Sequence, residues 1–371
     1  MKAIAWIHRW AGGIIGLILA ILGLTGTLLL WKGAWIALSV PGAGNAVTAA
    51  PAELADVTQK IVDGSDDPIR YIRFADNDVN VHIVSNGPKS GFYTDSSGTV
   101  LAAWDNVWGR VETALFEIHH YLLLGETGTT ISGLAALIGL GFVITGVILW
   151  WPTRKTFKLR LWPARMTRPS IIRQHRDLGV ILAPLLFLGM LTGVAMTLRP
   201  VANFLLSPIS SPAEMEAARE KPEFNAGSAE NADWQTIMAK AQARYPDAII
   251  RLISFPRAEG DPITIRMKQP AEWHNNGRTM LWFDGANGSL VGDSDALKLP
   301  QGLQIYNFSY PLHAAKVGGI IYIILQTLTG LALTLLGTLA VWSFWFRRKK
   351  KPAKRNMISD EITISAHSSI S

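Results

Sequence analysis

The sequence predicts a mainly α-helical membrane protein with four transmembrane helices in two parallel repeats and two small periplasmic α+β modules. Three observations lead to this fold class: long apolar runs, clusters of basic residues beside them, and one motif that occurs twice. A helix needs about 20 mostly apolar residues to cross the roughly 30 Å hydrocarbon core of a bilayer. Four runs reach this length, so we expect a lipid bilayer around them: Ala11–Leu30, Ile131–Trp151, Val180–Leu198 and Gly318–Phe346.

Basic residues predict the orientation of the chain in the membrane. They cluster near its start (Lys2, Arg9), between the second and third apolar runs (154–176) and after the fourth run (347–355). Because Lys and Arg beside membrane helices remain in the cytoplasm, both termini and the middle loop are expected there, in a multi-pass protein of the bacterial inner membrane. The net charge of +7 then reflects topology, and no nucleic-acid partner is expected.

One motif occurs in both halves of the chain. His8-Arg9 is followed by Gly12 and by Leu24-Thr25-Gly26, and His175-Arg176 is followed at the same offsets by Gly179 and by Leu191-Thr192-Gly193. Both copies start on the cytoplasmic side. The two halves are therefore predicted to form a parallel repeat about an axis along the membrane normal.

Each half also contains a candidate α+β module between its two apolar runs. Residues 51–63 and Asp233–Arg244 are predicted as helices, and Asp95 to Gly98 and Asp284 to Gly288 as turns of hairpins. Residues 200–231 are predicted as a linker or a loosely packed loop. The expected strands are Ile69–Phe74, Val79–Val84, Gly91–Thr94 and Thr99–Ala102 in the first module, and Ala248–Phe255, Pro262–Met267 and Arg278–Phe283 in the second.

These assignments divide the chain into eight segments. They are transmembrane helix 1 (1–36), the first periplasmic module (37–118), a histidine-containing segment with helix 2 (119–151), the basic cytoplasmic loop (152–172), helix 3 (173–199), the periplasmic linker with the second module (200–312), a histidine-containing segment with helix 4 (313–346) and the basic cytoplasmic tail (347–371).

A histidine lies at or just before the start of every apolar run, and imidazole is a common axial ligand of haem iron. His8 and His175 hold equivalent repeat positions near the cytoplasmic face, whereas His313 and either His119 or His120 lie near the periplasmic face. Two histidines on facing helices can sandwich a porphyrin. We therefore predict two non-covalent b-type haems, with these histidines as axial ligands to the iron. The alternative for each histidine is an interfacial or capping role.

The chain contains no cysteine, which narrows the kind of cofactor. Disulfides, iron–sulfur clusters, thiolate-ligated haem and covalently attached haem are all excluded. Any haem must be held without a covalent bond, and the periplasmic modules must fold without disulfides.

Several residues near the predicted haems have two interpretations. Adjacent residues on a helix point about 100° apart, so His119 and His120 cannot both face one iron. Spacing alone does not choose between them; we favour His119 as the iron ligand, with His120 supporting that ligand or pairing with a haem propionate. Arg9 and Arg176 either pair with haem propionates or serve only as membrane anchors. Glycines such as Gly12 either make room for a flat macrocycle or form ordinary small-residue helix contacts. The remaining histidines are predicted to lie on the surface: His82, His274 and His367.

The order of four motifs resembles that of the PepSY-associated transmembrane proteins. The motifs are Trp6-Ile-His8-Arg9-Trp10 with Leu24-Thr25-Gly26, Ile118-His119-His120 with Gly125-Glu126 and a helix ending in Leu149-Trp150-Trp151-Pro152, Gln174-His175-Arg176-Asp177, and Pro311-Leu312-His313 with Gly318-Gly319. The resemblance covers nearly the whole chain and implies that the modules are PepSY-like. Its second motif usually has one histidine, at the position of His119. The family includes iron-regulated inner-membrane proteins and FoxB-like siderophore–iron reductases, which implies two haems and ferric siderophore reduction.

Two functions follow from these features. The first is transfer of electrons from an unidentified cytoplasmic or membrane donor to a periplasmic acceptor, a ferric siderophore or other ferric chelate, which would make the protein a haem-dependent ferric reductase in iron acquisition. The alternative is a non-redox, membrane-anchored PepSY module that binds or inhibits an envelope partner. The parallel repeat also suggests a transporter, but the apolar runs contain no carboxylate to support one.

Overall fold

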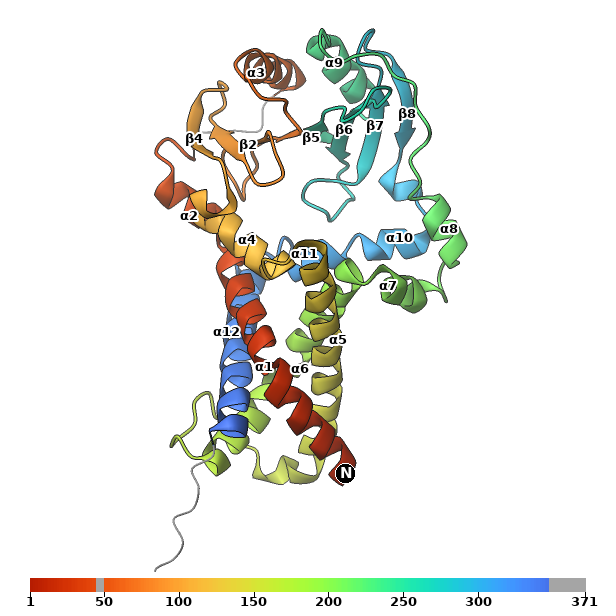
Figure 1. Cartoon of the computed structure of the whole chain (residues 1–371). Helices are drawn as coiled ribbons and strands as arrows, with labels where there is room; N and C mark the ends of the chain where they lie inside the picture. Colours follow the sequence, from red (N-terminus) through yellow and green to blue (C-terminus); the bar gives the residue numbers. More distant parts are fainter. Residues whose placement is uncertain (45–49, 347–371) are drawn as a thin grey trace, which may run out of the picture.

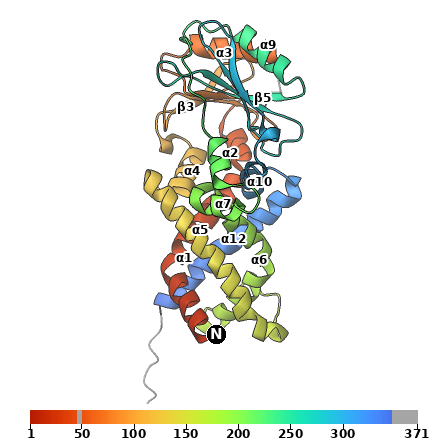
Figure 2. The same cartoon turned by 90° about the vertical axis from the view of Figure 1, so that its right-hand side faces the viewer.

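The computed structural model describes residues 1–44 and 50–346. A bundle of long helices stands beneath a layer of short helices, and above that layer lies a β-sheet with α3 and α9 on its far face (Figures 1 and 2). The predicted cytoplasmic tail 347–371, with His367 in it, lies outside the described residues.

The bundle consists of α1 (Lys2–Leu30), α5 (Gly125–Trp150), α6 (Arg168–Thr197) and α12 (Gly319–Trp345). All four are long and apolar enough to cross a membrane, which confirms the four predicted spans. Helix α6 begins at Arg168, within the segment 152–172 that was predicted as a loop. Pro169 occupies its first turn, where a missing backbone N–H breaks no helical hydrogen bond. His175 consequently lies inside the helix.

Helices α1 and α12 pack against each other through glycines. A Cβ atom added to Gly337 would lie 2.3 Å from the carbonyl oxygen of Gly16, and one added to Gly23 would lie 2.8 Å from that of Gly330. These distances leave no room for a side chain. Glycine at these positions therefore allows the two backbones to touch, as small residues do in membrane helix pairs.

Short helices connect the bundle to the sheet, and two of them carry predicted site residues. Helix α4 (Val111–Tyr121) carries His119 and His120 and immediately precedes α5, whereas α11 (Ser309–His313) ends at His313 shortly before α12. The segment 200–231, predicted as a linker, contains two short helices. The other short helices are α2 (Lys32–Ser39), α7 (Arg199–Leu206), α8 (Pro212–Ala217) and α10 (Gln301–Tyr306), with 3₁₀ turns η1 (Val107–Gly109), η2 (Trp151–Thr156) and η3 (Ala296–Lys298).

The two predicted modules share one antiparallel sheet of eight strands, in the order β4-β3-β2-β1-β5-β6-β7-β8. Strand β1 of the first half pairs with β5 of the second, with Ile72 opposite Ile253. The sequence predicted two modules and missed both this pairing and strand β8. The strands are β1 (Tyr71–Arg73), β2 (His82–Ser85), β3 (Gly91–Thr94), β4 (Val100–Trp104), β5 (Ile249–Ser254), β6 (Ile263–Lys268), β7 (Thr279–Phe283) and β8 (Leu290–Ser294).

Both predicted hairpin turns are present at the ends of the sheet. Asp95 Oδ1 accepts hydrogen bonds of 2.9 Å from the backbone N–H groups of Ser97 and Thr99. Gly98 has φ of +80° and Gly288, in the matching turn, has φ of +61°. Glycine adopts this left-handed conformation without the steric cost that a side chain would add.

Helices α3 (Pro51–Asp63) and α9 (Trp234–Arg244) cover one face of the sheet (Figure 1). Ile72, Ile253, Ile265 and Leu281 from the strands are fully buried there, together with Ile237 of α9. Because side chains alternate between the two faces of a strand, the other face points towards the short helices and the bundle. The sheet thereby holds the short helices that carry His119 and His313.

Candidate cofactor sites

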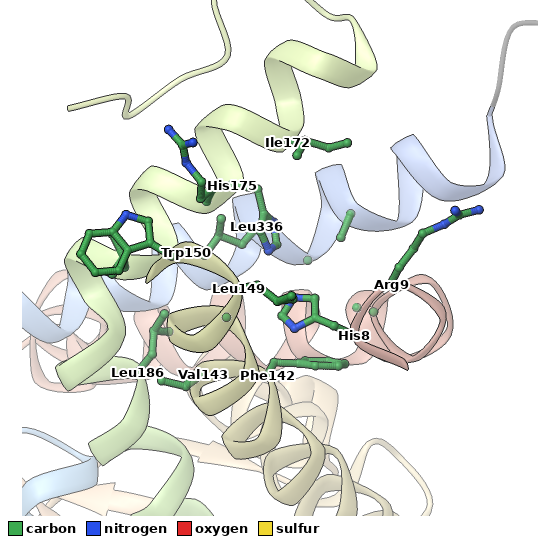
Figure 3. Close-up of a pocket in the computed structure, with 18 of the residues that line it drawn as sticks. His8, Arg9, Phe142, Val143, Leu149, Trp150, Ile172, His175, Leu186 and Leu336 are labelled. Atoms are coloured by element: carbon green, nitrogen blue, oxygen red, sulfur yellow. The ribbon is translucent and has the colours of Figure 1, made fainter. Parts of the chain in front are cut away.

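The first site is formed by His8 of α1 and His175 of α6, at the end of the bundle away from the sheet; we call these two residues the lower pair. Their ring centroids are 6.2 Å apart, with an angle of 86° between the ring planes. Figure 3 shows both imidazoles directed into the same space from different helices. His8 Nδ1 lies 2.8 Å from Thr145 Oγ1, and His175 is hydrogen-bonded to the backbone of Leu336. The lower pair is thus oriented by α5 and α12.

The lower pair lies in a cavity of about 570 Å³ inside the bundle. Phe142 packs beside His8 at 5.1 Å between ring centroids (Figure 3). Gly12 and Gly179, the glycines at the same offset in the two copies of the motif, line the cavity, and a Cβ atom on either would meet nothing within 4 Å. The shared glycines therefore leave open space beside the histidines.

The second site is formed by His119 of α4 and His313 of α11, just below the sheet; we call these two residues the upper pair. Their ring centroids are 6.1 Å apart, with an angle of 49° between the planes. His119 Nδ1 lies 3.0 Å from Thr25 Oγ1, and His313 Nδ1 lies 3.1 Å from Thr192 Oγ1. Each imidazole also contacts the backbone of a long helix: His119 is hydrogen-bonded to the backbone of Leu22, and His313 Nδ1 lies 3.2 Å from the Gly189 oxygen.

The repeated Leu-Thr-Gly motif therefore holds the upper pair. Its threonine contacts the Nδ1 atom of the histidine, and its glycine makes room for the ring. A Cβ atom on Gly26 would lie 2.8 Å from His119 Cε1, and one on Gly193 would lie 3.5 Å from His313 Cε1. Sequence reasoning found this motif but missed its role, although the shared spacing from His8 and His175 was a usable signal.

Of the two adjacent histidines, His119 belongs to the upper pair and His120 does not. The His120 ring stacks on Phe116 with 5.4 Å between centroids and contacts Tyr121 at 4.4 Å.

Burial lowers the pKa of His119 to about 3, with a smaller effect from His313, and burial also lowers the pKa of His313. Both imidazoles of the upper pair are therefore neutral at physiological pH. With Nδ1 engaged, Nε2 is the nitrogen left to bind a metal.

The spacing of both pairs fits a metal centre held between two imidazoles. A metal–imidazole bond is about 2 Å long, and the ring centroid lies about 1 Å behind the nitrogen, so two rings on opposite sides of one metal have centroids about 6 Å apart. The observed distances are 6.2 and 6.1 Å. Within 1–44 and 50–346, no three His, Cys, Asp or Glu residues gather around a common point. Within the described part of the chain, each pair therefore offers two imidazole ligands and no third side-chain ligand of these types.

Arg9 and Arg176, the two arginines predicted near the lower haem, both line the lower cavity but make different contacts. The Arg9 guanidinium lies 5.7 Å from the centroid of the Phe344 ring. Arg176 is hydrogen-bonded to Asp177 Oδ1 at 2.7 Å and to Thr156 Oγ1 at 2.9 Å, so much of its hydrogen-bonding capacity is used within the protein. Arg168 also lines the cavity and was missed by sequence reasoning.

Two histidines predicted as surface residues are buried in the sheet domain, which corrects that prediction. His82 is 1% exposed, and its Nδ1 accepts a hydrogen bond of 3.0 Å from the backbone N–H of Ala75. His274 is 5% exposed and stacks on Tyr310. Both lie in strands or loops whose burial depends on the docking of other elements, which sequence periodicity does not reveal.

The fold and these sites define a class: a membrane protein with four helices long enough to span the bilayer, two histidine pairs at different heights in or above the bundle, and an α+β domain on one side. The sequence pattern of the PepSY-associated TM region matches residues 5–348. The chain therefore belongs to the PepSY-associated transmembrane family. A search of the curated proteins finds no match to this sequence.

Proposed function

We propose that this protein carries two b-type haems and transfers electrons across the bacterial inner membrane to a periplasmic acceptor, a ferric siderophore or another ferric chelate. The observation that carries the proposal is the presence of two histidine pairs, with ring centroids 6.2 and 6.1 Å apart and with Nδ1 of His8, His119 and His313 already engaged. His8 and Thr25, which contacts the upper pair, lie 17 residues apart on α1. This separation corresponds to about 25 Å of helix, most of the roughly 30 Å hydrocarbon core.

In the lower site, His8 and His175 would hold a haem in the cavity between the four long helices. Thr145 and the Leu336 backbone fix the planes of the two rings. Arg9 and Arg168, on the cavity lining, supply positive charge for propionate groups. A bound haem supplies one-electron iron chemistry, and the protein tunes it through ligands, hydrogen bonds and burial.

In the upper site, His119 and His313 would hold the second haem next to the sheet domain. With both histidines as its protein ligands, such a haem would be suited to electron transfer more than to oxygen activation. Thr25 and Thr192 keep both rings in place and set the basicity of the ligands. Ferric iron held by hard oxygen ligands is released more easily after reduction, because Fe(II) binds such ligands less tightly.

The orientation and the repeat are parts of the same proposal. The basic segments 154–176 and 347–355 favour an orientation with both termini in the cytoplasm and the lower pair near the cytoplasmic face of the membrane. In this orientation the sheet domain would lie in the periplasm, the lower site would be nearer a cytoplasmic or membrane electron donor, and the upper site would be nearer the periplasmic acceptor. Each half supplies one histidine to each pair, and the strand order reads the same from β1 outwards as from β5 outwards. Both facts support a parallel two-fold repeat.

The test is a reduced-minus-oxidised visible spectrum of the purified full chain, with pyridine haemochrome quantification. We expect about two low-spin b-type haems per chain and loss of about one on replacing His175 by Ala. His120→Ala is the matched control, since this neighbour of His119 faces away from the upper pair and its loss leaves both haems. A colourless protein that does not take up added haem would contradict the proposal and favour a non-redox PepSY module that binds an envelope partner.

A further inference from the structure

The hairpin loop between β6 and β7 reaches from the sheet down to the short helices α10 and α11 (Figure 1). Trp273 in this loop packs on Phe308 with 4.7 Å between ring centroids, and His274 stacks on Tyr310 at 5.0 Å. Tyr310 precedes His313 of the upper pair by three residues. The loop therefore lies beside the upper pair, on the sheet side.

Several polar atoms of this hairpin are buried without a hydrogen-bond partner among the described residues. They include Nε of Arg266 on β6 and Nε of Arg278, which directly precedes β7. The Oδ1 atoms of Asn275 and Asn276 in the same loop are also buried and unpartnered. An amide side chain can be turned to present N–H instead of oxygen. With the amides turned in this way, all four side chains offer N–H donors at buried positions that no group in the described part of the chain uses.

The carboxylate nearest to the two arginines is already occupied. Glu272 accepts hydrogen bonds from the Gln269 backbone N–H at 3.0 Å, from Thr279 Oγ1 at 2.9 Å and from the Arg278 backbone N–H. The only side-chain hydrogen bond that Arg266 makes within the described chain runs from Nη2 to the Gly277 oxygen, at 2.7 Å. Two guanidinium groups therefore face a single carboxylate that binds the backbone and a hydroxyl.

In the first half of the chain, the positive charge on the corresponding hairpin is neutralised by a carboxylate. Between β2 and β3, Lys89 forms an ion pair of 2.9 Å with Glu117 on α4, the helix that carries His119. In the second half, Arg266 lies near Tyr310, Arg278 lies near Tyr306 and Tyr310, and the Glu272 carboxylate is shared by both guanidinium groups. Two partly buried cations that share one carboxylate keep an excess positive charge, which is costly, so an anion bound beside them would relieve that cost.

We infer that Arg266 and Arg278, with Asn275 and Asn276, form a binding site for a small oxyanion, a carboxylate or a phosphate group, beside the upper histidine pair. The planar guanidinium fork suits carboxylate and phosphate oxygens. Trp273 and His274 keep the loop docked on α11 and on Phe308, which directly precedes it, so the site depends on contacts that the described residues already make. The inference does not require haem, because no group in the site is a histidine of either pair.

The experiment is isothermal titration calorimetry of citrate and of inorganic phosphate into the full chain in a non-ionic detergent and an oxyanion-free buffer. A second arm compares thermal stability in phosphatidylcholine nanodiscs with and without phosphatidylglycerol, since a lipid headgroup offers the same phosphate chemistry as free phosphate. We expect binding of at least one probe, and about tenfold or greater weakening in Arg278→Gln and Arg266→Gln. Arg257→Gln, which removes the same charge from an exposed loop, serves as the control and keeps full affinity.

Arg278→Lys controls for misfolding, because it keeps the positive charge but lacks the planar, two-pronged guanidinium group. We expect this variant to bind the probe with intermediate affinity. Binding of citrate or phosphate that Arg278→Gln weakens supports a soluble ligand. A stabilisation that appears only with phosphatidylglycerol, and that the same variant removes, supports a lipid headgroup. If no probe binds, or if Arg278→Gln and Arg257→Gln bind equally well, the inference is wrong. Haem content is unchanged in all these variants, so this outcome is separate from any failure of the haem proposal.

Discussion

The two histidine pairs have nearly the same ring separation, 6.2 and 6.1 Å, but the protein holds them in different ways. His8 and His175 come from long helices and face a cavity of about 570 Å³. His119 and His313 come from short helices and are held by a threonine and a glycine on the long helices. One helical motif thus performs two tasks: its histidine contributes to the lower pair, and its Leu-Thr-Gly end positions the upper pair.

The largest effect is expected from filling the lower cavity. In Gly12→Leu the new side chain extends into open space beside His8, so it meets no backbone but occupies the room for a macrocycle. We expect loss of about one of two haems, with the upper site intact. Haemochrome quantification measures this directly. Gly141→Leu is the matched control, because a Cβ atom at Gly141 also meets nothing within 4 Å and the residue does not line the cavity.

The next effect is on the hydrogen bonds of the upper pair. Thr25→Val keeps the shape of the side chain but removes the hydroxyl 3.0 Å from His119 Nδ1. Loss of such an orienting partner typically weakens metal affinity about 10–100-fold, and Thr192→Val should behave alike. The rate of haem transfer to an apo-globin would measure the affinity of each variant, and potentiometric titration would measure the haem potential. Thr145→Val should alter the lower haem instead; an identical change in the same haem for all three variants would contradict two separate sites.

A smaller effect distinguishes the two halves of the upper site. Gly26→Ala places a methyl group 2.8 Å from His119 Cε1, whereas Gly193→Ala places one 3.5 Å from His313 Cε1, an ordinary contact. Overpacking of this kind costs about 1–3 kcal/mol, so Gly26→Ala should weaken haem binding at the upper site about tenfold. Gly193→Ala should stay close to the unmodified protein. Equal weakening in both variants would show that the glycines do not set the ring positions.

The smallest effect concerns a buried histidine that has no histidine partner. Burial lowers the pKa of His82 to about 4, below its unfolded value near 6.5. Between these values the unfolded chain binds more protons, so stability is full above pH 6.5 and decreases as the pH falls towards 4. The loss should be about 1 kcal/mol at pH 6, visible in thermal melts of the sheet domain. His82→Asn, which keeps an acceptor for the Ala75 N–H, should remove this part of the pH dependence.

Local sequence features predicted much of the architecture. The four spans follow from apolar length, and the turns at Asp95 and Asp284 from side-chain and glycine preferences. The equivalence of His8 and His175 came from the spacing of a repeated motif, and the structure brings these two residues together. Each of these features depends on residues close in sequence or on helical geometry, which is why the sequence alone was sufficient.

Contacts between distant segments decided the rest. The pairing of Ile72 with Ile253 joins the two halves in one sheet, and no local pattern specifies which strand edges meet. The choice of His119 over His120 depends on the angle at which α4 docks. The burial of His82 depends on the folding of the loop around Ala75. The sequence by itself determined the membrane class and the histidines to consider, whereas the tertiary structure decided their partners, because hydrogen bonds and packing between distant segments exist only once the chain has folded.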